Sequence, residues 1–309
     1  MTARFPVRDY DLAATLESGQ VFRWEQRGTA WEGVVGPHWY RIEPASGALV
    51  ATAATADADW TGLRCFLGMD DVLEDIQRTF PNDPPMQAAI AACPGLRLLH
   101  QDPWECLASF LLSSTKQIAQ IRQCVAMLCA RFGRPVPVPP GHSPNHQFPE
   151  ASVLARAGEA ALRECRLGFR ARYLAEVANR VAAGVLDLEA VRQRPTPEAR
   201  QQLMSLPGVG RKIADCVLLF AYGRPEAFPV DVWVLRALRG LYFPKRRPQP
   251  RTLLRFTATH FGPHAGYAQQ YLFHYARTYL GRGAFAGGPR RIRRPVSASS
   301  RSPAPHATH

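Results

Sequence analysis

The hydrophobic period of this sequence changes once, near residue 58. Before this point QVFRW alternates apolar and polar residues, and AWEGVV and HWYRIEP follow with a hairpin-like break at Gly36-Pro37. After it, apolar residues recur every three or four positions, as in DDVLEDIQRTF and PPMQAAIAAC. A period of two predicts strands and a period near 3.6 predicts helices. We therefore expect an α+β fold, with an N-terminal antiparallel β-rich domain followed by an α-helical body.

Helical periods continue through most of the chain. They occur in DPWECLASFLL, IAQIRQCVAMLCARF, EAALREC, ARYLAEVANRVAAG, TPEARQQLMSL, GRKIADCVLLFAYG, VDVWVLRALRGLYF, LLRFTATHFG and AGYAQQYLFHYART. The proline-rich PVPVPPGHSPNHQFP interrupts them as a connector without helical capacity. The last segment, rich in Gly, Arg, Ser and Pro, has the composition of a disordered chain. We expect a β-rich domain over 1–100, a helical body over 101–282 and a disordered basic tail over 283–309.

The positive charge of the chain favours a polyanionic partner. The net charge is +13, and the final twenty residues supply five arginines and no acid, which leaves 13 − 5 = +8 for the rest. The folded part is therefore basic on its own account. Such a balance favours nucleic acid, although a basic surface also serves plain solubility. Deletion of residues 284–309 would test whether the tail adds nonspecific affinity for DNA.

Apolar runs and cysteines argue against several protein classes. The longest apolar runs, such as SFLLSS and CVLLFAY, are far shorter than the roughly 20 residues that span a bilayer. The N-terminal MTARFPVRDYDL has no apolar stretch of a secretory signal, so we expect a soluble intracellular protein without membrane association. The seven cysteines are scattered, without a CxxC pair. They predict reduced thiols packed as small apolar residues, and no metal site.

One lysine stands out because the cations of this chain are almost all arginines. Three lysines, at positions 116, 212 and 245, stand against 38 − 3 = 35 arginines. Lys212 lies in LPGVGRKIADC, one helical turn before Cys216, so the two side chains share a helix face. Arginine cannot lose its proton or form an imine, whereas a lysine amine can do both. We infer nucleophilic chemistry at Lys212, with a solvated surface charge as the alternative.

The LPGVG element before Lys212 predicts a tight hairpin between two helices. Gly208 and Gly210 permit positive φ. The first N–H groups of the following helix have no partner within it, which suits a phosphate. Such a hairpin grips DNA without reading its sequence. A plain glycine-rich turn between helices is the alternative interpretation.

Asp231, in FPVDVWVL, is the second candidate catalytic group. It follows Pro229 and precedes an apolar-periodic helix, so its ordinary role is to cap that helix. A carboxylate fixed at a helix start opposite an amine could also orient the nucleophile or stabilise a developing cation. The two roles are compatible.

These residues together resemble those of a known family. The run LPGVGRKIADCVLLFAYGRPEAFPVDVWV is similar to the helix-hairpin-helix, Gly/Pro-rich loop and catalytic Asp of the DNA glycosylase superfamily. SGQVFRW, QDPWECLASFLLSS, LGFRARYL and GYAQQYLF resemble segments of 8-oxoguanine DNA glycosylases, in the same order and across about residues 10–280. The resemblance implies a helix-hairpin-helix glycosylase body. We expect a monomer that acts on damaged double-stranded DNA without a cofactor.

The resemblance also implies a reaction. The damaged purine is flipped out of the duplex into a pocket. Lys212 would attack C1′ of its nucleotide, expel the base and leave a Schiff base that undergoes β-elimination and nicks the strand. Asp231 would stabilise the oxocarbenium-like sugar or help activate the amine. The chain is therefore expected to be a bifunctional glycosylase and AP lyase for 8-oxoguanine.

Four residues match the family's base pocket. By the resemblance, the Gly19 carbonyl would accept the N7 hydrogen that 8-oxoguanine has and guanine lacks. Gln269 would bind the Watson–Crick edge, while Phe273 and Cys216 would enclose the ring. Gln269 and Phe273 stand at i and i+4, which puts them on one helix face. A turn glycine and a core phenylalanine are the alternative interpretations of Gly19 and Phe273.

Other residues would contact the DNA around the flipped base. Phe169 and Arg170 resemble the family's wedge and its probe of the orphaned cytosine. A buried aromatic at a helix start is the alternative for Phe169. The chain has Thr115-Lys116-Gln117 where family members carry an Asn-rich segment, and Gln120 where they carry a second cytosine-reading arginine. Trp233 stands where family members carry a histidine. These differences leave the opposite-base preference open.

Two other functions are compatible with parts of this pattern. A glycosylase for another damaged purine, such as an alkylated one, is the nearest, but alkylpurine relatives generally lack the lysine. No cysteine follows Cys216, so the iron–sulfur branch is excluded. A non-catalytic helix-hairpin-helix protein that only binds DNA needs neither Lys212 nor Asp231. The preference for arginine over lysine suggests a GC-rich bacterial genome and hence a cytoplasmic, nucleoid-associated protein.

Overall fold

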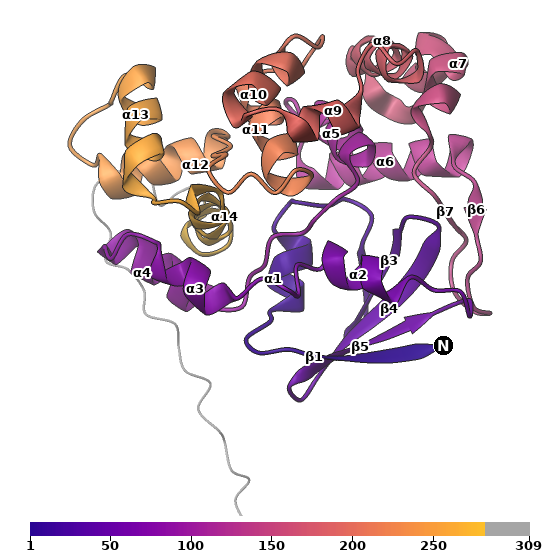
Figure 1. Ribbon diagram of the computed structural model, residues 1–309, viewed down its shortest axis with the longest axis horizontal. Coiled ribbons are helices and arrows are strands. Elements are labelled where there is room, and N and C mark those ends of the chain that lie inside the picture. Colours follow the sequence, from indigo (N-terminus) through magenta and orange to yellow (C-terminus); the bar gives the residue numbers. More distant parts are fainter. Residues whose placement is uncertain (282–309) are drawn as a thin grey trace, which may run out of the picture.

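The computed structural model describes residues 1–281, in which a sheet-bearing N-terminal part lies beside a larger helical part (Figure 1). Strands dominate before residue 58 and helices after it. The expected α+β fold is therefore confirmed. The predicted basic tail over 283–309 lies outside the described residues.

The N-terminal sheet has five antiparallel strands in the order β1-β5-β4-β3-β2. Their bounds are β1 Thr2–Pro6, β2 Glu25–Arg27, β3 Ala30–Val35, β4 His38–Ala45 and β5 Ala48–Ala53. The strands expected from AWEGVV and HWYRIEP are β3 and β4, which pair through a turn where Gly36 has φ +55°. Glycine adopts this positive φ without a steric penalty. Trp31 of β3 and Ile42 of β4 face each other in the core beneath the sheet.

Two parts of the first fifty residues are not the expected strands. Leu12–Glu17 forms helix α1, because Asp11 caps it by accepting a hydrogen bond from the Ala14 N–H. QVFRW contains no strand. Its apolar residues pack into two different cores, Val21 and Trp24 under the sheet and Phe22 with the helices. The pattern here reflects burial on two sides of a loop, and the strand prediction was wrong.

Helices occupy most of the chain from residue 60 onward. Those before the body are α2 Trp60–Phe66, α3 Leu73–Arg78 and α4 Pro84–Ala92. Those of the body are α5 Pro103–Leu111, α6 Ile118–Phe132, α7 Ala151–Leu162, α8 Arg170–Ala182, α9 Leu188–Gln193, α10 Thr196–Met204, α11 Arg211–Phe220, α12 Val232–Ala237, α13 Pro250–His260 and α14 Ala265–Tyr275. Wider π-type turns extend three of these helices, namely η1 Arg163–Leu167, η2 Leu238–Tyr242 and η3 Ala276–Leu280. Each segment with a helical period overlaps one of these helices, as predicted.

The proline-rich connector between α6 and α7 contains no helix, as expected. It forms a short antiparallel pair, β6 Pro135–Val136 and β7 Asn145–His146. Proline lacks the N–H that a helix interior requires, but it is tolerated in a short edge strand. The body is therefore helical apart from this small hairpin.

Two large buried clusters form the main cores of the described residues, beside a small third one of Val34, Trp39 and Val136. The smaller of the two large clusters lies under the sheet and includes Trp24, Trp31 and Tyr40. The larger runs through the helical body and also includes Ile76 of α3 and Met86 of α4. Helices α3 and α4, although they precede residue 100, thus pack with the body. The division into domains at residue 100 stays a prediction, which limited proteolysis would test.

The described helices are short. The longest, α6, has 15 residues. Among residues 1–281, no helix combines the length and the apolar character needed to cross a membrane.

Candidate active site

A cavity of about 950 Å³ lies between α11, α12, α14 and the loop that joins α5 to α6. Its size is that of a ligand pocket. It is lined by most of the predicted site residues, namely Gly19, Thr115, Gly208, Gly210, Lys212, Cys216, Asp231, Gln269 and Phe273. The fold therefore brings residues from positions 19 to 273 to one place. Phe169, Arg170 and Gln120 do not line it.

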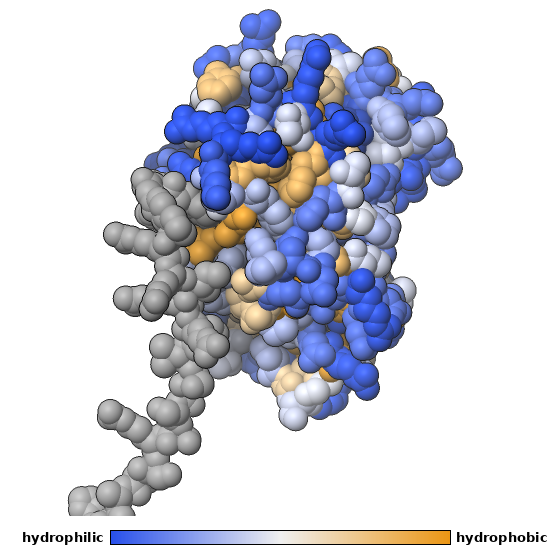
Figure 2. All heavy atoms as spheres, turned by 90° about the vertical axis from the view of Figure 1, so that its left-hand side faces the viewer, coloured by the Kyte–Doolittle hydropathy of each residue, from blue (hydrophilic) through white to orange (hydrophobic). Residues whose placement is uncertain are grey.

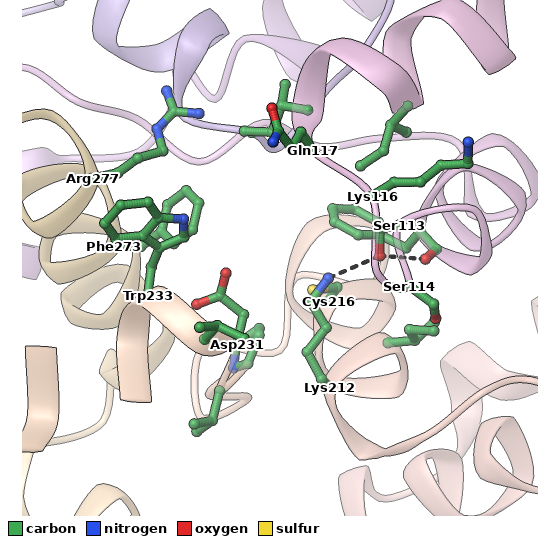
Figure 3. Close-up of a pocket in the computed structure, with 18 of the residues that line it drawn as sticks. Ser113, Ser114, Lys116, Gln117, Lys212, Cys216, Asp231, Trp233, Phe273 and Arg277 are labelled. Atoms are coloured by element: carbon green, nitrogen blue, oxygen red, sulfur yellow. Dashed lines mark hydrogen bonds between the residues drawn. The ribbon is translucent and has the colours of Figure 1, made fainter. Parts of the chain in front are cut away.

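Lys212 projects into the cavity from the first turn of α11 (Figure 3). Its Nζ donates a hydrogen bond of 3.0 Å to the Oγ of Ser113, at the end of α5. The amine also lies 5.1 Å from the centroid of the Phe110 ring. Ser113 in turn donates to the Phe110 carbonyl. The amine is thus held at a defined position, and no carboxylate of residues 1–281 forms an ion pair with it.

Cys216 lies one turn after Lys212 on the same helix and is only 3% exposed. Burial raises the pKa of its thiol to about 12, against an opposing effect of the nearby Lys212 charge. The thiol is therefore neutral near pH 7, since thiolate formation requires a pH near the pKa. Cys216 therefore lines the cavity as a buried neutral thiol.

Asp231 faces the cavity from the opposite side to Lys212 (Figure 3). It caps α12, because its carboxylate accepts a 2.8 Å hydrogen bond from the Val234 N–H. Burial raises the pKa of Asp231, although that hydrogen bond and the charge of Lys212 oppose the rise. Desolvation of the carboxylate is the cause. The predicted cap is confirmed, and the same carboxylate lines the cavity.

The turn at Gly19 is held by buried hydrogen bonds on both sides. The Ser18 carbonyl accepts a 2.9 Å bond from Nε2 of Gln270, and Gln20 bonds to the backbone of Arg97 and Leu99. Gly19 has φ +78°, and a Cβ there would lie 2.8 Å from a methyl group of the Ile118 side chain. Only glycine fits this turn without strain.

Gln269, on α14, is the one predicted base-reading side chain whose polar end is left unpaired. It is 3% exposed, and its Oε1 has no hydrogen-bond partner among the described residues. A buried polar group without a partner costs roughly 1–3 kcal/mol. Phe273 follows one turn later and lines the same cavity, 3.5 Å from the position a Gly19 Cβ would occupy.

Arg277 is a cavity residue that the sequence did not single out. Its guanidinium donates a 2.6 Å hydrogen bond to the Glu17 carbonyl and lies 5.7 Å from the centroid of the Phe273 ring. It therefore links the end of α1, next to the Gly19 turn, to Phe273. Its i+4 spacing from Phe273 was the available signal. Ser113 was also missed, because nothing local marks it.

Phe169 and Arg170 lie at the start of α8, outside the cavity. Phe169 is 54% exposed, as a wedge requires, and the Arg170 guanidinium lies 4.3 Å from its ring centroid. Arg170 is buried and donates to the carbonyls of Ser114 and Leu167 and to the Thr115 hydroxyl. A contact of Arg170 with DNA stays a prediction, and it requires these bonds to be exchanged.

Polar groups of the loop between α5 and α6 are also hydrogen-bonded within the protein. Thr115 has φ +57°, which is uncommon for a residue with a branched Cβ. The Gln120 side chain accepts a 3.0 Å hydrogen bond from the Gln117 N–H and so completes a capping box at the start of α6. The predicted DNA contacts of Thr115 and Gln120 also stay predictions.

The expected hairpin joins α10 to α11. Gly208 has φ +78°, and a Cβ there would lie 2.6 Å from the Tyr173 ring, so the position requires glycine. Gly210 is the N-cap of α11, and within the described residues no side chain caps this helix. The first N–H groups of α11 are thus available to a phosphate.

Comparison with known proteins agrees with this arrangement. The model of the 8-oxoguanine DNA glycosylase N-terminal domain matches residues 3–107, and that of the HhH-GPD superfamily base excision DNA repair protein matches residues 108–261. A probable N-glycosylase/DNA lyase of Methanothermobacter thermautotrophicus is 30% identical, with 89% of this chain and 96% of the relative covered. The chain belongs to the 8-oxoguanine DNA glycosylase family. It is a base excision DNA repair protein.

Two further members of this family are similar over most of the chain. The N-glycosylase/DNA lyase OGG1 of Arabidopsis thaliana is 31% identical, and the match covers 87% of this chain and 79% of that protein. The 8-oxoguanine glycosylase/lyase of Clostridium acetobutylicum, solved with duplex DNA that has cytosine opposite 8-oxoG, superposes with a TM-score of 0.83 at 27% identity. That match covers 90% of this chain and 97% of the other.

Proposed function

We propose that this glycosylase removes 8-oxoguanine from duplex DNA and then cleaves the strand as an AP lyase, with Lys212 as nucleophile. The observation that carries the proposal is the unpaired Gln269 side chain, buried in a cavity that Lys212 and Asp231 border from opposite sides. A buried amide without a partner is completed by a ligand that can hydrogen-bond to it. The edge of a flipped purine is such a ligand.

The reaction has three steps, namely substitution at C1′, opening of the sugar ring and β-elimination. The Lys212 amine attacks C1′ and loses a proton, the C1′–N9 bond breaks, and the base leaves with its electron pair and takes up that proton. The C1′–O4′ bond then breaks as the sugar ring opens, O4′ takes up the remaining proton of the nitrogen, and the C1′–N bond becomes the double bond of the Schiff base. Loss of a C2′ proton then expels the 3′-phosphate, which nicks the strand. The Asp231 carboxylate stabilises the positive charge that develops on the sugar.

Discrimination from guanine would come from the Gly19 carbonyl. The N7 of 8-oxoguanine carries a hydrogen that this carbonyl can accept, whereas guanine presents an acceptor and would leave the carbonyl unpaired. The hydrogen bonds on both sides of the Gly19 turn support this role, since they keep the carbonyl from turning away. Phe273 and the neutral Cys216 would cover the two faces of the base.

Borohydride trapping on an 8-oxoguanine duplex tests the nucleophile. The wild-type protein should become covalently attached to the DNA, and K212Q should not. K116Q is the matched control, because Lys116 also lines the cavity but its side chain runs away from the Lys212 amine (Figure 3). K116Q should still trap. A K212Q protein that traps as well as the wild type would refute the assignment.

The choice of lesion is tested with a substrate panel. Single-turnover excision should be fastest on 8-oxoguanine, slower on an alkylated purine, and absent on guanine. A faster rate on the alkylated purine would favour the glycosylase for another damaged purine. The same panel would expose a protein that binds DNA without any turnover.

We also propose that the protein acts as a monomer on nucleoid DNA in the bacterial cytoplasm. Support comes from the cavity, whose catalytic and base-reading residues all belong to one chain. Sedimentation of the protein alone and with a lesion duplex would test this. A dimer in both samples would contradict it.

A further inference from the structure

Asp231 is the last acidic residue of the sequence, and all charged residues after it are basic. Within the described residues, six exposed cations lie on η2, on α13 and on the loop between them. These cations form what we call the basic ridge: Arg239, Lys245, Arg246, Arg247, Arg251 and Arg255.

The ridge cations have no carboxylate partner among residues 1–281, since none of the ion pairs within 4.0 Å includes them. Several exposed arginines elsewhere are paired with carboxylates. Arg64 pairs with Asp70, and Arg78 pairs with Glu74. Unpaired like charges on one surface repel one another, and a bound polyanion removes this repulsion.

The loop of the ridge is stiff. It reads PKRRPQP over 244–250, and each proline fixes one φ angle. Pro248 is buried, and the Arg246 guanidinium lies 5.5 Å from the Phe243 ring centroid. Cations held in this way lose less conformational freedom on binding. Hydrophilic side chains cover much of the upper part of the face where α13 lies (Figure 2).

The ridge continues from one side of the active-site cavity. α12 begins at Asp231 in the cavity, and Arg236 lines the cavity with its guanidinium 5.4 Å from the Trp233 ring. The hairpin glycines before α11 and Lys212 on α11 also border the cavity, and Lys212 lies across it from Asp231 (Figure 3). A duplex that delivers a nucleotide into the cavity must cross its mouth. Its two flanks then extend over these two sides.

We propose that the basic ridge is a second phosphate-binding surface, which holds the duplex flank on the far side of the cavity from the helix-hairpin-helix. Its partner is the sugar-phosphate backbone of double-stranded DNA, bound without regard to sequence. This inference rests on the proposed function in one respect, namely that the flipped nucleotide enters the active-site cavity. Phosphate binding by the ridge requires no catalysis.

The first test measures how binding to an undamaged duplex depends on salt. The ridge variant K245Q/R246Q/R247Q and the control R64Q/R78Q/R163Q each lose three positive charges. A phosphate contact contributes about 0.9 to the slope of log K against log salt, so the ridge variant should flatten the slope by roughly 2 to 3. The control should keep the wild-type slope. Equal slopes for the two variants would overturn the proposal.

The second test locates the flank. Two duplexes carry an uncleavable abasic analogue, and each has a different flank shortened to about four base pairs. The wild type should bind one of them more weakly than the other, and the ridge variant should bind both equally. A ridge variant that keeps the wild-type difference would contradict the placement. If Lys212 failed to trap DNA while the ridge variant still flattened the salt slope, only the proposed reaction would fall.

Discussion

The side of the cavity proposed to face the lesion, called here the lesion-facing side, differs from the loop expected to face the opposite strand. On the lesion-facing side, hydrogen bonds fix the Gly19 turn while the Gln269 side chain stays unpaired. On the loop, Arg170 and Gln120 are already bonded within the protein. A rigid site with an unpaired group is completed by its ligand, whereas a satisfied loop must exchange bonds before it reads a base. We therefore expect lesion recognition to be organised in advance and opposite-base recognition to require rearrangement of the loop.

The largest effect on the lesion-facing side is expected at Asp231. D231N keeps the helix cap but removes the charge that stabilises the sugar cation, so single-turnover excision should fall about 10²- to 10³-fold. Burial raises the pKa of Asp231, so the wild-type rate should decline as the pH falls through this raised pKa and the carboxylate gains a proton. D231N should lack this decline. Rates measured over roughly pH 4 to 9 check both points. If D231N kept the decline in rate at low pH, the titrating group would be a residue other than Asp231.

Removal of the unpaired amide should separate activity from stability. Q269L should lower kcat/KM for 8-oxoguanine about 10- to 100-fold, because a hydrogen bond to the base is lost. Its melting temperature should be no lower than that of the wild type, since an unpaired polar group is replaced by an apolar one. Q202L is the matched control, because the Gln202 Oε1 is also unpaired but lies outside the cavity. If Q269L and Q202L lowered kcat/KM equally, Gln269 would have no specific role in binding the base.

A smaller effect is expected at Arg277, a positioning residue. R277A removes the link between the Glu17 carbonyl and Phe273, so KM should rise about fivefold with a smaller change in kcat. R156A, an exposed arginine on α7, serves as control. Steady-state kinetics distinguish the two kinetic constants. A fall in kcat alone would contradict the positioning role.

The smallest effect is expected from the base opposite the lesion. Excision rates opposite C, A, G and T should agree within about threefold, because the loop's polar groups are bonded internally and direct base reading usually contributes 1–3 kcal/mol. Single-turnover rates on the four duplexes check this. A rate on the cytosine duplex about tenfold above the others would show that Arg170 or Thr115 does exchange its bonds on DNA.

Much of the fold was predictable from local patterns. The periods of β3, β4 and α11 predicted these elements, and the Asp231 cap followed from its place before an apolar-periodic helix. QVFRW failed for a physical reason. The hydrophobic pattern shows which side chains are buried, but it does not show which element or core buries them. A loop that packs against two cores can therefore have the pattern of a strand.

The sequence by itself determined the local chemistry of this protein. Lys212 with Cys216, and Gln269 with Phe273, stand one helical turn apart, and helix geometry puts each pair on one face. Only the tertiary structure decided that Ser113 holds the Lys212 amine, that Arg277 reaches Glu17, and that Arg170 faces inward. These bonds join residues 99, 260 and 56 positions apart. Local spacing cannot determine such contacts, because the packing of whole elements decides which distant segments meet.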